Sequence, residues 1–294
     1  MNSRTSMINL PYSLRILKSK RKLLNFLYLA KNLRNPSFLG SVMFPNAKFS
    51  NEYPYEDLEI IRRFLTESHV SLEKKLVTRL LNKTTGTVKI DNSLFNIECL
   101  EDLYHVSLCY EQETLSFIEA AVKPGGVFVD VGANIGGYTV RLAKKSRVYA
   151  FEPHPLNYSL LRSNLKLNNL NEASAYNCAV SDTVGDAELY TSKFHGCHSI
   201  VNRQEEHVTV AVTTLDKILS DVKKVDVLKI DVEGAEPHVF RGAIKTCLKT
   251  RFVVFEGSTS SIKVFAEGFL TALGFRYVGK FDFNNIAYSS RHET

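Results

Sequence analysis

Apolar runs of strand length recur along the second half of the chain, and longer stretches of mixed polarity separate them. The runs predict strands at residues 127–131, 147–152, 174–180, 225–231 and 252–256. The stretches beside them predict helices at residues 111–122, 137–145, 155–167, 214–221, 238–248 and 261–273. Strands that alternate with helices are typical of a doubly wound α/β sheet.

Two further features complete the predicted domain, which spans residues 85–294. Short β segments around residues 189–190 and 208–212 form an insertion ahead of the fourth strand. The last two strands, 275–280 and 283–289, are joined by too few residues for a crossover connection. We therefore expect these two strands to pair antiparallel.

Residues 1–84 precede this domain and predict a basic, mainly helical extension, followed by a hairpin at 88–90 and 94–97. The first fifty residues carry nine Lys and Arg side chains and no acid, so the net charge of +6 leaves −3 (6 − 9) for the rest. The apolar residues beside the basic block at 18–22 form no clean helical stripe. The pattern therefore favours an ordinary packing helix over contact with an anionic membrane surface, which stays the alternative.

The cysteines and the short apolar segments predict a cytoplasmic protein. The five cysteines are an odd number with no C-x-x-C pair, which favours reduced thiols inside a cell. The apolar stretch 23–30 is too short to span a membrane and lacks the cleavage site of a secretory signal. Any membrane contact is thus expected to be peripheral.

The first strand of the domain ends in a glycine-rich turn that opens a helix. Asp130 lies at the strand end, and Gly132 and Gly136 let the backbone turn tightly and approach a ligand. The helix that follows offers unpaired backbone N–H groups at its N-terminus. Such a turn is typical of a nucleotide-type cofactor site, but the glycines alone do not identify the cofactor.

Two acids favour S-adenosylmethionine over NAD. Glu152 ends the second strand about 20 residues after the turn, where an acid accepts hydrogen bonds from the ribose hydroxyls of either cofactor. Asp130 would repel the pyrophosphate of a dinucleotide, whereas S-adenosylmethionine brings an ammonium group and no phosphate. Asn134 also replaces the second glycine of the dinucleotide fingerprint. A turn without any ligand would leave a buried strand-end acid without a partner, which is unfavourable.

A second acidic cluster follows the strand at 225–231. Asp231, Glu233 and Glu236 stand at the strand end, and Pro237 suits the first turn of the next helix. In an open α/β sheet, ligands bind at this edge. The sequence therefore predicts that both acidic groups border one site.

These motifs resemble the FkbM-type methyltransferase family. The resemblance extends from about residue 110 to residue 294; D-V-G-A-N-I-G at 130–136 and L-K-I-D-V-E-G-A-E at 228–236 are its specific parts, and shorter matches are Glu152-Pro153, 177–182 and 254–256. The resemblance implies a class I methyltransferase (Rossmann-like) fold with an antiparallel final strand and S-adenosylmethionine as cofactor. The acceptor would be a hydroxyl of a sugar, glycan, glycolipid or secondary metabolite. The expected cofactor-binding residues are Asp130, Gly132, Asn134, Gly136, Glu152, Pro153 and Asp182.

The acids after the strand at 225–231 are the leading candidates for catalysis. A hydroxyl acceptor must lose a proton during methyl transfer, so a base is needed near the reacting end of the cofactor. We expect Asp231 or Glu233 to take that role. Glu236 suits the N-terminal end of a helix, and Glu256 either lines the acceptor pocket or pairs with a lysine.

His195 and His198 flank Gly196-Cys197 and invite comparison with a zinc site, but no fourth protein ligand is nearby. We expect no metal there, and instead expect His195, His198 and Ser199 to line the acceptor pocket. The carboxylate cluster offers oxygen ligands for a divalent ion, although nothing in its spacing demands one.

Three other functions stay open. A dinucleotide-dependent oxidoreductase would also have an acid at the position of Glu152. It would, however, have an apolar residue in place of Asp130 and a glycine in place of Asn134. A nucleic-acid methyltransferase would suit the basic N-terminal segment, yet the chain has neither a D/N-P-P-aromatic motif nor a Pro-Cys nucleophile, so a nucleic-acid partner is not expected. A non-catalytic binding module is the third alternative.

Overall fold

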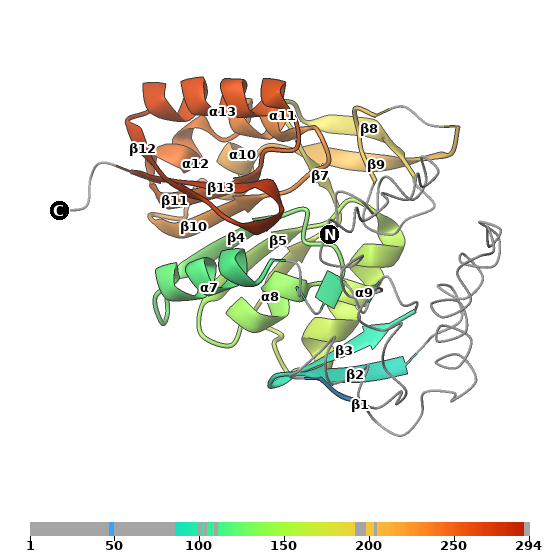
Figure 1. Ribbon diagram of the computed structural model, residues 1–294. Helices are drawn as coiled ribbons and strands as arrows, with labels where there is room; N and C mark the ends of the chain where they lie inside the picture. Colours follow the sequence, from blue (N-terminus) through green and yellow to red (C-terminus); the bar gives the residue numbers. More distant parts are fainter. Residues whose placement is uncertain are drawn as a thin grey trace, which may run out of the picture.

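The computed structural model describes residues 47–49, 86–98, 102, 105–106, 108, 111–191, 198–202 and 205–290. Seven strands form its main sheet (Figure 1). They are β4 (Val127–Val131), β5 (Arg147–Phe151), β6 (Ser174–Tyr176), β10 (Val225–Ile230), β11 (Thr250–Glu256), β12 (Phe275–Lys280) and β13 (Asn285–Ser290). Their order across the sheet is β12-β13-β11-β10-β4-β5-β6.

The strand order confirms the predicted class I methyltransferase fold. β4 pairs in parallel with β5 on one side and with β10 on the other, so the chain reverses its direction of progress across the sheet at β4. Ligands bind at such switch points. β13 lies between β11 and β12 and pairs antiparallel with both, as predicted for the final strand.

Helices cover both faces of the sheet (Figure 1). One face carries α7 (Gln112–Ala121), α8 (Gly137–Leu142) and α9 (Pro155–Leu167), and the other carries α10 (Leu215–Ile218), α11 (Glu236–Arg241), α12 (Ile244–Leu248) and α13 (Ser260–Ala272). Successive residues of β4 point to opposite faces, so Phe128 belongs to one buried cluster and Val129 to the other. Burial on both faces explains why the central strands are largely apolar.

The predicted strand at 174–180 is in fact two strands in two sheets. β6 ends at Tyr176, and β7 (Ala179–Val180) joins a small sheet of order β7-β9-β8 with β8 (Gly185–Tyr190) and β9 (His207–Thr213). Asn177 lies at the break and donates its side-chain amide to the carbonyls of Glu152 and Pro153. The break therefore ties the insertion to the end of β5.

The predicted helix at 238–248 is also divided, into α11 and α12. The division falls at Gly242, whose backbone packs against the carbonyl of Ser181 so closely that a Cβ atom would lie 1.9 Å from that oxygen. The close approach excludes any side chain at this position and turns the chain between the two helices.

The hairpin at the start of the domain forms as predicted, with β2 (Gly86–Ile90) and β3 (Ser93–Ile97). A short strand, β1 (Ala47–Phe49), pairs antiparallel with β2. The hairpin is attached to α9, since Asn164 Oδ1 accepts a hydrogen bond from the backbone of Asn96 at 2.6 Å. The rest of the predicted extension at 1–84 lies outside the described residues. Within those residues, no helix combines the length and the apolar character that crossing a bilayer requires.

Candidate active site

A cavity of about 390 Å³ opens at the carboxyl ends of β4, β5, β10 and β11. The glycine turn after β4 forms one wall, and acidic residues after β10 and β11 form another. The small insertion sheet contributes Leu189, and the segment after residue 197 contributes His198 and Ile200. The cavity thus lies at the predicted edge of the sheet.

The glycine turn depends on left-handed backbone at three positions. Gly132 has a φ of +84°, Asn134 of +50° and Gly136 of +98°. A Cβ atom on Gly132 would lie 1.8 Å from the carbonyl oxygen of Asp231, so only glycine lets the ends of β4 and β10 approach this closely. The backbone N–H groups of Gly132 and Ala133 both donate to the carbonyl of Phe151 at 3.0 Å. These contacts hold the turn beside the end of β5.

Glu152 is buried beside this turn. Its Oε2 accepts a hydrogen bond from the backbone N–H of Asn134 at 2.9 Å, and its Oε1 accepts one from that of His154 at 2.8 Å. Burial raises the pKa of Glu152 to about 7 despite these two donors. Each carboxylate oxygen keeps a further lone pair for a ligand hydroxyl. Pro153 lines the cavity next to it.

Asp130 is 1% exposed and lines the same cavity. Its Oδ2 accepts a hydrogen bond from the hydroxyl of Thr139 at 2.6 Å. Its Oδ1 is buried and has no hydrogen-bond partner within the described part of the chain. Burial raises the pKa of Asp130, and Lys229 opposes that rise. A buried carboxylate oxygen without a partner indicates a place for a hydrogen-bond donor of a ligand.

Lys229 is a site residue that the sequence pattern did not reveal. It is 2% exposed within β10, and its Nζ lies 2.9 Å from Oδ2 of Asp231 and 4.8 Å from the ring centre of Tyr138. Burial lowers the pKa of Lys229, but the charges of Asp231, Glu111 and Asp130 outweigh burial and raise it overall. The signal for it in the sequence is a lysine within a largely apolar strand.

Glu111 is the second missed residue. It is 3% exposed and lines the cavity just before α7. Its carboxylate accepts hydrogen bonds from the hydroxyl of Tyr138 at 3.0 Å and from the side-chain amide of Asn285 at 2.8 Å. Burial raises its pKa to about 7, while the charge of Lys229 acts in the opposite direction. Nothing local in the sequence predicts these partners, because they come from α8 and β13.

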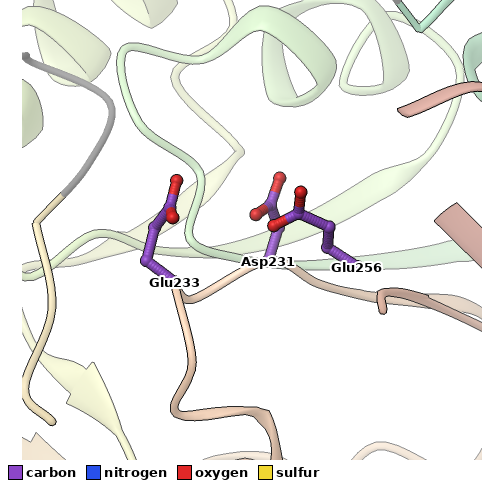
Figure 2. Close-up of side chains that lie close together, drawn as sticks. All are labelled: Asp231, Glu233 and Glu256. Carbon is purple, nitrogen blue, oxygen red and sulfur yellow. The ribbon is translucent and has the colours of Figure 1, made fainter. Parts of the chain in front are cut away.

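The structure brings three acids together beyond the ends of β10 and β11. Carboxylate oxygens of Asp231, Glu233 and Glu256 all lie within 4.8 Å of one another, and Figure 2 shows the three side chains directed into the same space. Burial, together with the charges of Asp231 and Glu233, raises the pKa of Glu256 to about 10. Glu256 therefore carries a proton at neutral pH in the protein alone. Oxygen ligands in this arrangement are those that Mg²⁺ or Ca²⁺ prefers.

Glu233 is held in a left-handed conformation with a φ of +52°. Its carbonyl accepts hydrogen bonds from the hydroxyl of Ser199 at 2.9 Å and from the amide of Asn202 at 2.8 Å. His198 stacks on His154 with 4.0 Å between the ring centres. Ser199 thus attaches the insertion to the acidic wall of the cavity, and His198 attaches it to the segment that follows β5. His195 and Cys197 lie outside the described residues.

Two further acids that the sequence indicates, Glu236 and Asp182, have their contacts away from this acidic cluster. Glu236, the first residue of α11, accepts hydrogen bonds from the backbone N–H groups of Val232 and Gly234, which lie just before the helix. Asp182 does not line the cavity, and its carboxylate instead faces Arg241 Nε at 3.1 Å. Gly136 also lies behind the cavity wall, at the N-terminal end of α8.

Comparisons with known proteins agree with this geometry. A family model described as "Methyltransferase FkbM domain" matches residues 130–277. "Methyltransferase 1" of Beauveria bassiana is 33% identical over 141 residues, which cover 39% of this chain and 57% of that protein. The chain therefore spans little more than half the length of this relative.

Two further relatives have more specific names. "Hexuronic acid methyltransferase AglP" of Haloferax volcanii is 26% identical over 167 residues, covering 55% of this chain and 69% of that protein. "2-O-methyltransferase NoeI" of Sinorhizobium fredii is 26% identical over 179 residues, covering 53% and 72% respectively.

Proposed function

Since the chain belongs to the FkbM methyltransferase family, we propose that it transfers a methyl group from S-adenosylmethionine to a hydroxyl group of a sugar, glycan, glycolipid or secondary metabolite. The observation that carries the proposal is the position of the acids after β10 and β11, which share one cavity with the glycine turn and Glu152. The name of the Sinorhizobium fredii relative specifies O-methylation and supports a hydroxyl acceptor, and the name of the Haloferax volcanii relative supports a sugar. They give no support to a dinucleotide-dependent oxidoreductase or a nucleic-acid methyltransferase.

The residues around the glycine turn fit S-adenosylmethionine. Oδ1 of Asp130, buried and without a partner in the described part, suits an ammonium group. Glu152 suits ribose hydroxyls, because its carboxylate is already oriented by two backbone donors. When bound, this cofactor supplies an electrophilic methyl group on a sulfonium centre.

The acidic wall supplies the acceptor chemistry. In an in-line displacement the hydroxyl oxygen would form a bond to the methyl carbon while the bond from that carbon to the sulfonium sulfur breaks. The sulfur would leave as a neutral thioether, and the hydroxyl proton would pass to a base. Asp231 is the proposed base, since its side chain reaches the cavity from the strand that neighbours β4. Lys229, 2.9 Å away, orients the Asp231 carboxylate, and Glu233 and His198 border the acceptor.

Asp231→Asn tests this assignment. The substitution keeps the shape and removes the base, so the rate of methyl transfer from labelled S-adenosylmethionine to a panel of sugars and glycosides should fall by about 10²–10⁴-fold. Affinity for S-adenosylmethionine, measured by calorimetry, should stay unchanged. Loss of cofactor binding would make Asp231 a binding residue, and full activity would transfer the role of base to Glu233 or His198. A wild-type protein that binds the cofactor but methylates no hydroxyl would be a binding module.

A further inference from the structure

The cavity is strongly acidic. Its lining includes six carboxylic side chains, namely Glu111, Asp130, Glu152, Asp231, Glu233 and Glu256. Lys229 is the one lysine or arginine among the described residues that line it. Any molecule that enters this cavity therefore meets an excess of hydrogen-bond acceptors and negative charge.

The single cation is already engaged. The Lys229 side chain is 3% exposed, and its ammonium group lies 2.9 Å from the Asp231 carboxylate and above the ring of Tyr138. A carboxylate on an acceptor would have to share this ammonium group with Asp231, whose charge Lys229 already compensates.

A separate observation also indicates a ligand rich in donors. Asp130 is 1% exposed, and one of its carboxylate oxygens has no partner within the described part of the chain although the residue lines the cavity. The ammonium group of the cofactor would satisfy that oxygen. The carboxylates of Asp231 and Glu233 and the protonated carboxyl of Glu256 then face the acceptor, and vicinal sugar hydroxyls can donate hydrogen bonds to them.

We infer that the acceptor is an uncharged sugar and that the site discriminates against sugars with a carboxylate near the methylated hydroxyl. This inference rests on the proposed function. The acidic cluster provides the selectivity through repulsion of the wrong acceptor as well as attraction of the right one. This acceptor class differs from the one in the name of the Haloferax volcanii relative, which specifies a hexuronic acid.

The protonation of the cavity supports the inference. Burial raises the pKa of Glu111 and Glu152 to about 7, and burial with neighbouring acids raises that of Glu256 to about 10. Burial keeps protons on these acids, and at Glu256 repulsion from the charges of Asp231 and Glu233 adds to the effect. A further anion would add to this repulsion at close range, where a single unit charge changes an equilibrium by about tenfold or more.

Paired glycosides test the inference. Methyl glucoside and methyl glucuronide, and likewise methyl galactoside and methyl galacturonide, differ only at C6. With wild-type protein and S-adenosylmethionine, kcat/KM should favour the neutral member of at least one pair by about tenfold or more. The assay is run once with EDTA and once with Mg²⁺, because a cation bound by the acidic cluster would attract the uronide.

Equal or better turnover of the uronides in either condition overturns the inference, as does a protein that binds the cofactor but methylates no neutral sugar. Glu233→Gln, which removes one charge from the cluster, should reduce the preference for neutral over acidic glycosides. Glu267→Gln, at an exposed position of α13, should leave that preference unchanged. The wild-type ratio decides the inference even when the Glu233 variant is inactive. Failure of the proposed function is distinct, since it would appear as an absence of S-adenosylmethionine binding.

Discussion

Asp130 and Glu152 are two buried carboxylates with different local partners. Glu152 accepts two backbone hydrogen bonds, whereas one oxygen of Asp130 has no partner in the described residues. The difference follows from position. Glu152 lies just past β5, where the turn after β4 directs the N–H group of Asn134 toward it, and Asp130 lies within β4, where its neighbours use their backbone groups in the sheet. The first is oriented in advance, and the second needs a ligand.

Asp130→Ala and Glu152→Ala should each weaken S-adenosylmethionine binding by about 1–3 kcal/mol, because each removes a charged hydrogen-bond acceptor. Calorimetry on the purified variants measures the change, and NAD should bind to none of the proteins. Asp182→Ala is the matched control, since that carboxylate faces Arg241 outside the cavity. Unchanged affinity in both cavity variants, or an equal loss in the control, would contradict the site assignment.

At the scale of elements, the local sequence predicts a strand or helix correctly where residues within or beside that element determine its ends. β4 and α9 match their predicted ranges. β-branched residues make up most of β4 and glycines flank it, and Pro155 begins α9. The break between β6 and β7 was missed because it depends on contacts of Asn177 with the end of β5. Distance in sequence also explains why Glu111, which bonds to Asn285, was missed, and why the contact of Asp182 with Arg241 was not foreseen.

The break between α11 and α12 gives a prediction at this scale. Gly242→Ala should destabilise the protein by about 1–3 kcal/mol, because the new Cβ atom would overlap the carbonyl of Ser181. Urea denaturation measures the loss. Gly268→Ala is the control, since Gly268 lies within α13 and a Cβ atom added there would meet no other atom within 4 Å. It should stabilise the protein by about 0.5–1 kcal/mol, and equal effects of the two substitutions would rule out the proposed packing.

At the scale of the whole molecule, the buried acids make the stability of the ligand-free protein depend on pH. The pKa values of Glu111 and Glu152 rise from 4.5 to about 7, and that of Glu256 rises from 4.5 to about 10. In the unfolded chain these carboxyls release their protons near a pH of 4.5, so above that pH the folded protein holds more protons than the unfolded chain. Stability therefore falls as pH rises, through about pH 7 for the first two acids and on toward about pH 10 for the third.

Urea midpoints measured between about pH 5 and about pH 9 should decline steadily with pH. Glu256→Gln should reduce the decline above about pH 7, where that acid still holds the proton that it loses on unfolding. Glu267→Gln should leave the profile unchanged, because this residue is exposed on α13. A midpoint that is constant or increases over this interval would contradict the burial of protonated acids.

The charge distribution of the chain gives a further prediction. Nine positive charges and no acid lie in the first fifty residues, and their sum exceeds the net charge of the chain. If these residues attach the protein to a surface, full-length protein should sediment with anionic liposomes at low salt and be released at high salt. A variant without residues 1–44, which keeps β1, should lose this association and retain cofactor binding. Absence of sedimentation at low salt would leave the segment a packing extension.

The insertion of β13 between β11 and β12 has a consequence for the order of folding. The ribosome releases β12 before β13, yet β12 has no neighbour in the sheet until β13 has taken its place. Until then the edge of β11 is open to strands of other molecules, which is a condition for aggregation. The nascent chain therefore passes through a stage in which the cofactor half of the sheet can be complete while this edge is still unpaired.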